Sequence, residues 1–486
     1  MMTITVHLAL LGWIPITVAL FVLFRPHIAA SLSLIGGIAL LPAGRAYDVP
    51  LLPALNQSTI PALASLVMLL ALRWPMVMGA RLGRGPELCV LLLIGASFIT
   101  NVTNMDPVVF GANVRSAMAP LDTINDAFLW GVLWGVPFVL GRVVVRSAAD
   151  ARDVLVVLML FGLLYLPLVL VELRTGPWLH KIVYGDLPFA FTFAQQMKFG
   201  GFRPLVLMTH GLATAAFMLY CAIAAVTLLR ARHRIREFGL APAAIALVLI
   251  LGPVKSVGVW TFGAVVLPAI CLLRPKLQLA MTVAIAVLVL SYPMIRVAGL
   301  VPVDDMVSLA EEYVGARSAN SLFGRLKTEE EIMVRAQERL WFGWGGYGRY
   351  QIYDEFTGEM LSTLDGVWVI TIGEGGAVRF ILLFGMLILP IVIAYRNIDR
   401  IRSRQARQLI AGLAVIVAIR SLDLLPNSGI EAYLTFMGGA LVGAVRGEVS
   451  NRRSPPRSEG PKRRADISES PRDEPPASLN SLLQPR

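Results

Sequence analysis

The stretch from Arg325 to Phe380 reads RLKTEEEIMVRAQERLWFGWGGYGRYQIYDEFTGEMLSTLDGVWVITIGEGGAVRF, and long apolar segments precede and follow it. It carries arginines, a glycine-rich run and many acidic residues, which a bilayer does not accept without compensation. The whole chain is 56% hydrophobic with a mean hydropathy of +0.69, far above a soluble globular protein. We therefore predict an all-α, polytopic membrane protein that holds most of this polar stretch outside the bilayer.

Apolar segments of membrane-spanning length recur on both sides of that stretch. A hydrocarbon core takes roughly 20 apolar helical residues, and on that measure we expect about 12 to 13 spans. This count divides the chain into N-terminal spans (1–296), an extracytoplasmic loop with short helices (297–377), C-terminal spans (378–445) and a disordered tail (446–486). The expected spans are approximately 8–24, 28–41, 60–72, 88–100, 128–145, 154–171, 210–229, 240–254, 257–273, 277–295, 378–395, 409–425 and 430–445.

Basic residues gather in every second loop, for example in 230–236 and 396–407. Basic short loops stay in the cytoplasm, so the loops 172–209 and 297–377 are expected on the outer, periplasmic side. The same rule explains the net charge of +11 without nucleic acid, for which no binding module is visible.

Cofactor chemistry finds no support in the sequence. Cys89, Cys221 and Cys271 lie inside expected spans, where a free thiol behaves as a small apolar side chain. The five histidines are scattered without the spacing of metal ligands. We expect no disulfide, metal or cofactor.

The run 321–340 is rich in helix formers and predicts an extramembrane helix. Two interpretations of its arginines stay open. Arg335 lies one turn after Glu331 and fits a salt-bridge ladder on a solvated face. Arg325 and Arg339 are better placed to bind an anion.

The next segment alternates glycines and aromatics, from Trp341 through Trp344 and Tyr347 to Arg349. Glycine lets a backbone approach a ligand closely, and aromatic faces pack against sugar rings. The competing interpretation is an aromatic belt at the membrane surface. Arg349, directly after the turn, favours a binding loop.

Charged residues also lie at the outer ends of expected helices. Asp365 opens an apolar run, as a helix N-cap or as a catalytic base. Arg203 and His210 flank the start of the span 210–229, and Lys255 either snorkels or binds a ligand. Arg420 is expected to pair with a carboxylate one turn later.

In this order the pieces resemble the O-antigen polymerase and ligase superfamily, the Wzy and WaaL type of bacterial envelope glycan enzymes. Members are similar in their dozen spans and in an outer loop with an Arg-bearing helix, a glycine turn and a trailing E-x-G. The matching motifs here are Phe202-Arg203-Pro204 with His210, Lys255-Ser256, Gly324-Arg325-Leu326, Gly343-Trp344-Gly345-Gly346-Tyr347-Gly348, Asp365-Gly366 and Glu374-Gly375-Gly376.

The resemblance implies a C-type membrane glycosyltransferase of the bacterial inner membrane, active on the periplasmic side without a metal. It implies an undecaprenyl-diphosphate-linked glycan as donor, a glycan or lipid A core as acceptor, and contacts with membrane lipids and other envelope polysaccharide proteins. The residues it assigns to the diphosphate are Arg203, Arg325, Arg339, Arg349 and Lys255, those to catalysis Asp365, His210 and Glu374, and those to the glycan Trp341, Trp344 and Tyr347.

The chain departs from the family at Asp365-Gly366, where members usually show His-Asn. The general base, and with it the choice between polymerase and ligase, therefore stays open. A flippase or polysaccharide transporter is the alternative, because it also needs many spans, buried charges and glycine-interrupted helices.

Overall fold

The computed structural model describes residues 2–49, 53–188, 196–235, 238–362, 364–429 and 431–451. The expected tail therefore lies mostly outside the described residues, as does part of the loop 172–209. The fold is 71% helical, which confirms the predicted all-α class. The helices are α1 (Ile4–Leu23), α2 (Pro26–Leu40), α3 (Thr59–Met78), α4 (Glu87–Val102), α5 (Pro120–Trp130), the π-helix η1 (Gly131–Gly135), α6 (Val136–Val144), α7 (Ala148–Thr175), α8 (Leu179–Tyr184), α10 (Gly211–Arg230), α11 (Ala241–Leu249), α12 (Val257–Leu272), α13 (Pro275–Val297), α14 (Val303–Val314), α15 (Ala316–Gln337), α16 (Val367–Asn397), the 3₁₀ helix η2 (Ile398–Arg400), α17 (Arg404–Asp423) and α18 (Ala432–Asn451).

Within the described residues, eight helical segments are long and apolar enough to cross a membrane, and three shorter apolar helices accompany them. A multi-pass membrane protein is thus confirmed. The expected span 240–254 forms only the nine-residue helix α11, which ends before the turn that carries Lys255. Helix α16 begins at Val367, before the expected span 378–395, and is interrupted at Gly376, close to the expected boundary.

Among the described residues, four short antiparallel hairpins interrupt the helices, and the sequence analysis predicted none of them. Each hairpin is a separate two-stranded sheet. The pairs are β1 (Ala46–Tyr47) with β2 (Leu55–Asn56), β3 (Val108–Phe110) with β4 (Asn113–Arg115), β5 (Met197–Lys198) with β6 (Gly201–Phe202), and β7 (Arg234–Ile235) with β8 (Phe238–Gly239).

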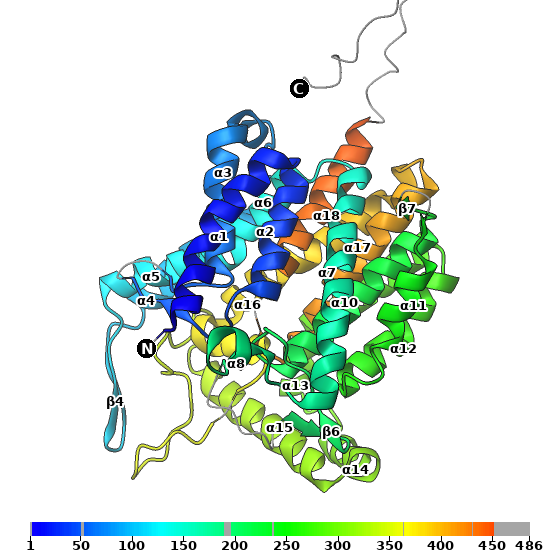
Figure 1. The fold of residues 1–486 in the computed structure, drawn as a ribbon. Coiled ribbons are helices and arrows are strands. Elements are labelled where there is room, and N and C mark those ends of the chain that lie inside the picture. Colours follow the sequence, from blue (N-terminus) through cyan, green and yellow to red (C-terminus); the bar gives the residue numbers. More distant parts are fainter. Residues whose placement is uncertain are drawn as a thin grey trace, which may run out of the picture.

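Figure 1 shows a bundle of long helices with α14, α15 and β6 at one end and the C-terminal end of α18 with β7 at the other. We call the first of these the α15 end. Helix α17 lies in the core, since 83% of its apolar window is buried. Helix α18 packs very closely on α6 and the residues after it, because Gly439, Gly443 and Gly447 face backbone carbonyls there with no room for a Cβ.

Helix α16 is interrupted at Gly376, where φ is +70°, a conformation that favours glycine. A helix break inside a membrane protein frees backbone groups that must find other partners. The carbonyls of Gly373 and Glu374 accept from the N–H groups of Trp344 and Gly345 at 2.9 and 2.8 Å. The glycine-rich segment Gly343–Gly348, which we call the glycine turn, therefore supplies hydrogen-bond partners at the break in α16.

The other side of the break is satisfied in the same way. Ala377 N–H donates to the Leu340 carbonyl at 2.8 Å, and Val378 N–H donates to Trp341 at 3.2 Å. A Cβ on Gly376 would overlap the Trp341 carbonyl, so two backbones meet here. The sequence predicted that the glycine turn approaches a ligand closely, and in this structure the group that it approaches is the backbone of α16.

Candidate functional site

Four ionisable side chains from distant parts of the sequence meet at the α15 end, beside the start of α10. They are Arg203, His210, Arg325 and Asp365, and we call them the Arg203–Arg325 cluster. Arg325 Nε lies 2.8 Å from Asp365 Oδ2. Arg203, Arg325 and Asp365 all lie near enough to His210 to act on its pKa. The sequence analysis named each of these residues, and the structure brings them together.

Arg203 is only 7% exposed. Its Nη2 donates to the Lys255 carbonyl at 3.1 Å, and its Nε has no hydrogen-bond partner among the described residues. Burial lowers the pKa of Arg203, and the nearby Arg325 lowers it further. Two guanidinium groups therefore lie near enough to repel each other, and the buried one has an unpartnered donor, an arrangement that an anion would stabilise.

The segment that carries Arg203 is anchored by a residue that the sequence analysis did not single out. Glu172, fully buried near the end of α7, accepts from the backbone N–H groups of Leu205 and Val206, both at 2.6 Å. Its other oxygen accepts from Leu179 N–H at 3.0 Å. An isolated carboxylate in an apolar span was the available signal, since such a group needs partners.

His210 caps the N-terminus of α10, as its Nδ1 accepts from Leu212 N–H at 3.1 Å. Burial lowers the pKa of His210, Arg203 and Arg325 lower it further, and Asp365 partly opposes them. A neutral imidazole with an accepting Nδ1 carries its proton on Nε2, which lies 3.4 Å from the Gln196 amide nitrogen, so His210 is a candidate donor through Nε2–H. It must leave the cap before it can accept a proton at Nδ1.

Asp365 does not cap α16. The N-cap position is Gly366, without a side-chain hydrogen bond, so the structural alternative for Asp365 is wrong. The carboxylate is 37% exposed and bound to Arg325, which lies in the middle of α15 and not at a helix end. Asp365 is thus a partly exposed carboxylate paired with Arg325, and its role as a proton acceptor stays a prediction.

Lys255 lies close to the cluster but contributes through its backbone carbonyl, which binds Arg203. Its own φ is +56°, and its Nζ occupies the space that a Cβ at Gly201 would fill. The ammonium group therefore packs over β6, and its predicted contact with a diphosphate stays a prediction.

Two other predicted diphosphate ligands lie in a different place, around the glycine turn. Arg339 Nη1 donates to Thr103 O and Asn104 Oδ1 at 2.7 and 2.6 Å. Arg349 has no exposed surface, and its Nε donates to the Trp344 carbonyl at 2.9 Å. The structure does not bring these two arginines to the Arg203–Arg325 cluster.

Arg335 does not form the expected ladder. Glu331 pairs with Lys327 at 4.0 Å, whereas Arg335 lies over the rings of Phe110 and Trp344 at 4.7 and 4.1 Å. Its Nη2 donates to the Arg349 carbonyl at 2.9 Å. Arg335 is thus part of the packing around the glycine turn.

The three predicted glycan-contacting aromatics differ in accessibility. Trp344 is 8% exposed and has the guanidinium groups of Arg335 and Arg339 over its ring at 4.1 and 4.5 Å, which leaves little ring surface for a sugar. Trp341 and Tyr347 are 63% and 56% exposed. Their contact with glycan stays a prediction.

Glu374 lies in a second charged group, within α16. Arg379 Nη1 is 3.7 Å from Glu374, and Arg379 Nη2 is 2.7 Å from Asp126. The Arg379 guanidinium also lies 4.9 Å from the Trp130 ring. Glu374 is therefore placed beside the helix break and away from the contacts of the Arg203–Arg325 cluster.

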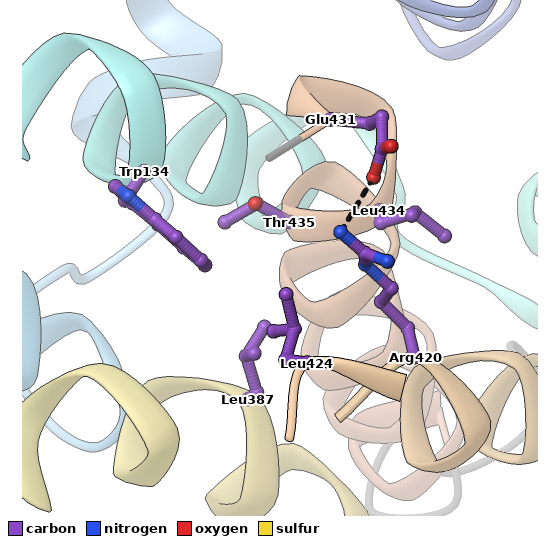
Figure 2. Close-up of a pocket in the computed structure, with 7 residues that line it drawn as sticks. All are labelled: Trp134, Leu387, Arg420, Leu424, Glu431, Leu434 and Thr435. Carbon is purple, nitrogen blue, oxygen red and sulfur yellow. Dashed lines mark ion pairs between the residues drawn. The ribbon is translucent and has the colours of Figure 1, made fainter. Parts of the chain in front are cut away.

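The buried Arg420 pairs with Asp423 at 2.6 Å, as predicted, and also with Glu431 at 2.8 Å. Figure 2 shows this second pair at the edge of a small cavity next to Trp134, Leu387 and Thr435. The cavity volume of about 10 Å³ has room for one water molecule and none for a sugar.

Cys89, Cys221 and Cys271 are free thiols. Within the described part of the chain, no three His, Cys, Asp or Glu side chains are grouped as metal ligands. A scan of the sequence against protein-family models finds no match, and a search of curated proteins finds no significant match.

Proposed function

We propose that this protein is a membrane glycosyltransferase that polymerises or transfers undecaprenyl-diphosphate-linked glycan units in the bacterial inner membrane. The observation that supports the proposal is the Arg203–Arg325 cluster, in which Arg325 pairs with Asp365 and the buried Arg203 lies near Arg325 and His210. In this proposal the α15 end faces the periplasm, in line with the basic loops expected in the cytoplasm.

The proposed reaction is a single displacement. The acceptor hydroxyl oxygen bonds to the anomeric carbon while the bond from that carbon to the diphosphate oxygen breaks. The electron pair leaves with the lipid diphosphate, and Asp365 accepts the hydroxyl proton. Such a displacement inverts the anomeric centre.

Arg203 and Arg325 stabilise the charge that develops on the departing diphosphate. A guanidinium group binds two phosphate oxygens at once, and fixed cations in a shielded site stabilise developing negative charge. His210, as an Nε2–H donor, adds a further hydrogen bond to a phosphate oxygen. Arg339 and Arg349 act indirectly here, by holding the glycine turn in the break of α16.

The test is an analysis of lipid-linked glycans in a deletion strain that carries the wild-type or a variant gene. We expect Arg203→Ala and Asp365→Asn to stop polymer formation at normal protein level. Lys327→Gln, an exposed residue of α15, is the matched control and keeps it. Normal polymer with Arg203→Ala contradicts the proposal.

The same assay separates the activities. Accumulated single repeats indicate a polymerase, and accumulated long lipid-linked polymer indicates a ligase.

A transporter or flippase is the second candidate, because a membrane helix interrupted beside a buried Arg379–Asp126 ion pair is typical of transport sites. Its distinguishing result is accumulation of lipid-linked repeats on the cytoplasmic leaflet. Arg379→Gln would then have a larger effect than Arg203→Ala.

A further inference from the structure

Glu329 is a buried carboxylate of α15 and belongs to none of the groups described above. It is 8% exposed, and its Oε2 lies 3.7 Å from Arg296 Nε at the end of α13. Tyr292 of the same helix donates its hydroxyl to Oε2 at 3.5 Å. Arg296 Nη2 also donates to the Leu326 carbonyl at 2.7 Å. The end of α13 therefore holds α15 at two points.

These contacts lie directly beside the proposed site. Glu329 follows Arg325 by one helical turn, so both side chains leave the same face of α15. Beneath them, the Tyr292 ring lies 5.0 Å from that of the fully buried Trp368, perpendicular to it. Trp368, in the first turn of α16, in turn follows Asp365 by three residues in the sequence. We call the contacts of Glu329 with Arg296 and Tyr292 the seat of α15. This seat joins α15 to the helices on which the anion site depends.

We infer that Glu329 is a positioning residue: it seats α15 on the ends of α13 and α16 and thereby sets the place of Arg325 opposite Asp365 and Arg203. The seat itself stands on the contacts above, and its consequence for anion binding rests on the proposed function. Loss of the seat lets α15 move, and Arg325 moves with it.

The seat is sensitive to pH. Burial raises the pKa of Glu329 to about 7 from an ordinary value of 4.5, whereas Arg296, Trp368, Tyr292 and Arg325 oppose the rise. The carboxylates of α14, which also packs on α15, are exposed to solvent: Asp304, Asp305, Glu311 and Glu312.

The direction of the pH effect follows from proton binding. Glu329 holds its proton more tightly when α15 is packed on α13 than when α15 is released. Packing of α15 is therefore favoured below the ordinary pKa of 4.5 and weakens as the pH rises through about 7.

The experiment measures hydrogen–deuterium exchange of residues 316–337 in the full-length protein in lipid nanodiscs, corrected for intrinsic exchange. In the wild type we expect protection to fall roughly 10-fold between about pH 5 and about pH 8. Glu329→Gln is uncharged at both values, so its protection stays constant. Glu330→Gln removes the neighbouring exposed carboxylate and keeps the wild-type response.

Inorganic pyrophosphate is the probe for the consequence. In the Glu330→Gln control, the Kd for pyrophosphate is expected to change with pH as in the wild type. The Glu329→Gln protein is expected to lose the part of this change that comes from movement of α15. A wild-type helix whose protection does not change with pH, or a Glu329→Gln protein that retains the change, overturns the inference. Failure of pyrophosphate to bind the wild type at either pH contradicts the proposed function and leaves the exchange result standing.

Discussion

Two groups of arginines lie at the α15 end, and they differ in what their guanidinium groups bind. Arg339 and Arg349 donate to backbone carbonyls and amide oxygens around the glycine turn. Arg203 and Arg325 meet beside one carboxylate, and the buried Arg203 keeps a donor unpartnered among the described residues. An arginine whose donors are bound to carbonyls stabilises the fold, whereas an arginine with an unpartnered donor is available to an anion.

The largest expected effect is that of Arg349→Ala. The substitution leaves the carbonyls of Trp344 and Ser116 without a donor in a buried site. We expect a loss of about 3–5 kcal/mol of stability, from about 1–3 kcal/mol for each unsatisfied group. Thermal unfolding in nanodiscs measures it. A normally stable variant with no pyrophosphate binding would place Arg349 in the anion site.

Gly376→Ala tests the break that the glycine turn fills. A Cβ there overlaps the Trp341 carbonyl and demands a positive φ from alanine. We expect a loss of about 2–4 kcal/mol and weaker protection of the amides of Ala377 and Val378 in hydrogen exchange. Unchanged protection at these two amides contradicts the docking of the turn into α16.

Arg325→Gln tests the other group of arginines, the Arg203–Arg325 cluster. The Arg325–Asp365 pair is partly exposed, so its removal costs at most about 1 kcal/mol of stability. Pyrophosphate affinity is expected to fall about 10-fold to 100-fold, because a charge-assisted contact is lost. Isothermal titration with the purified protein measures it. A large loss of stability with unchanged affinity would make Arg325 a structural arginine like Arg349.

The smallest expected effect belongs to Gly324→Ala, beside Arg325 on α15. Nothing lies within 4 Å of the added Cβ, and alanine favours a helix over glycine by about 0.5–1 kcal/mol. We expect slightly raised stability and unchanged pyrophosphate binding. A marked loss of binding would show that a ligand approaches the α15 backbone at this glycine.

The residues of the cluster were predictable from the sequence, because Arg203, His210 and Asp365 are polar groups at the ends of apolar runs and Arg325 lies on the predicted extramembrane helix. The glycine turn was recognised, but its partner was not. A run of glycines indicates that another group comes close, and the pattern is the same whether that group is a sugar or a broken helix. Glu329, in a run of three glutamates, gave no sign of burial in the sequence.

The amino-acid sequence by itself determined the class of the protein, since 56% hydrophobic residues in long runs are stable as helices in a membrane. It also indicated that charged residues at the ends of apolar runs, such as Arg203 and Arg420, need partners. Only the tertiary structure decided which partners they have. Arg325 and Arg349 have the same side chain on neighbouring segments, and we expect different roles because Arg325 is partly exposed beside Asp365, whereas Arg349 is buried and donates to backbone carbonyls.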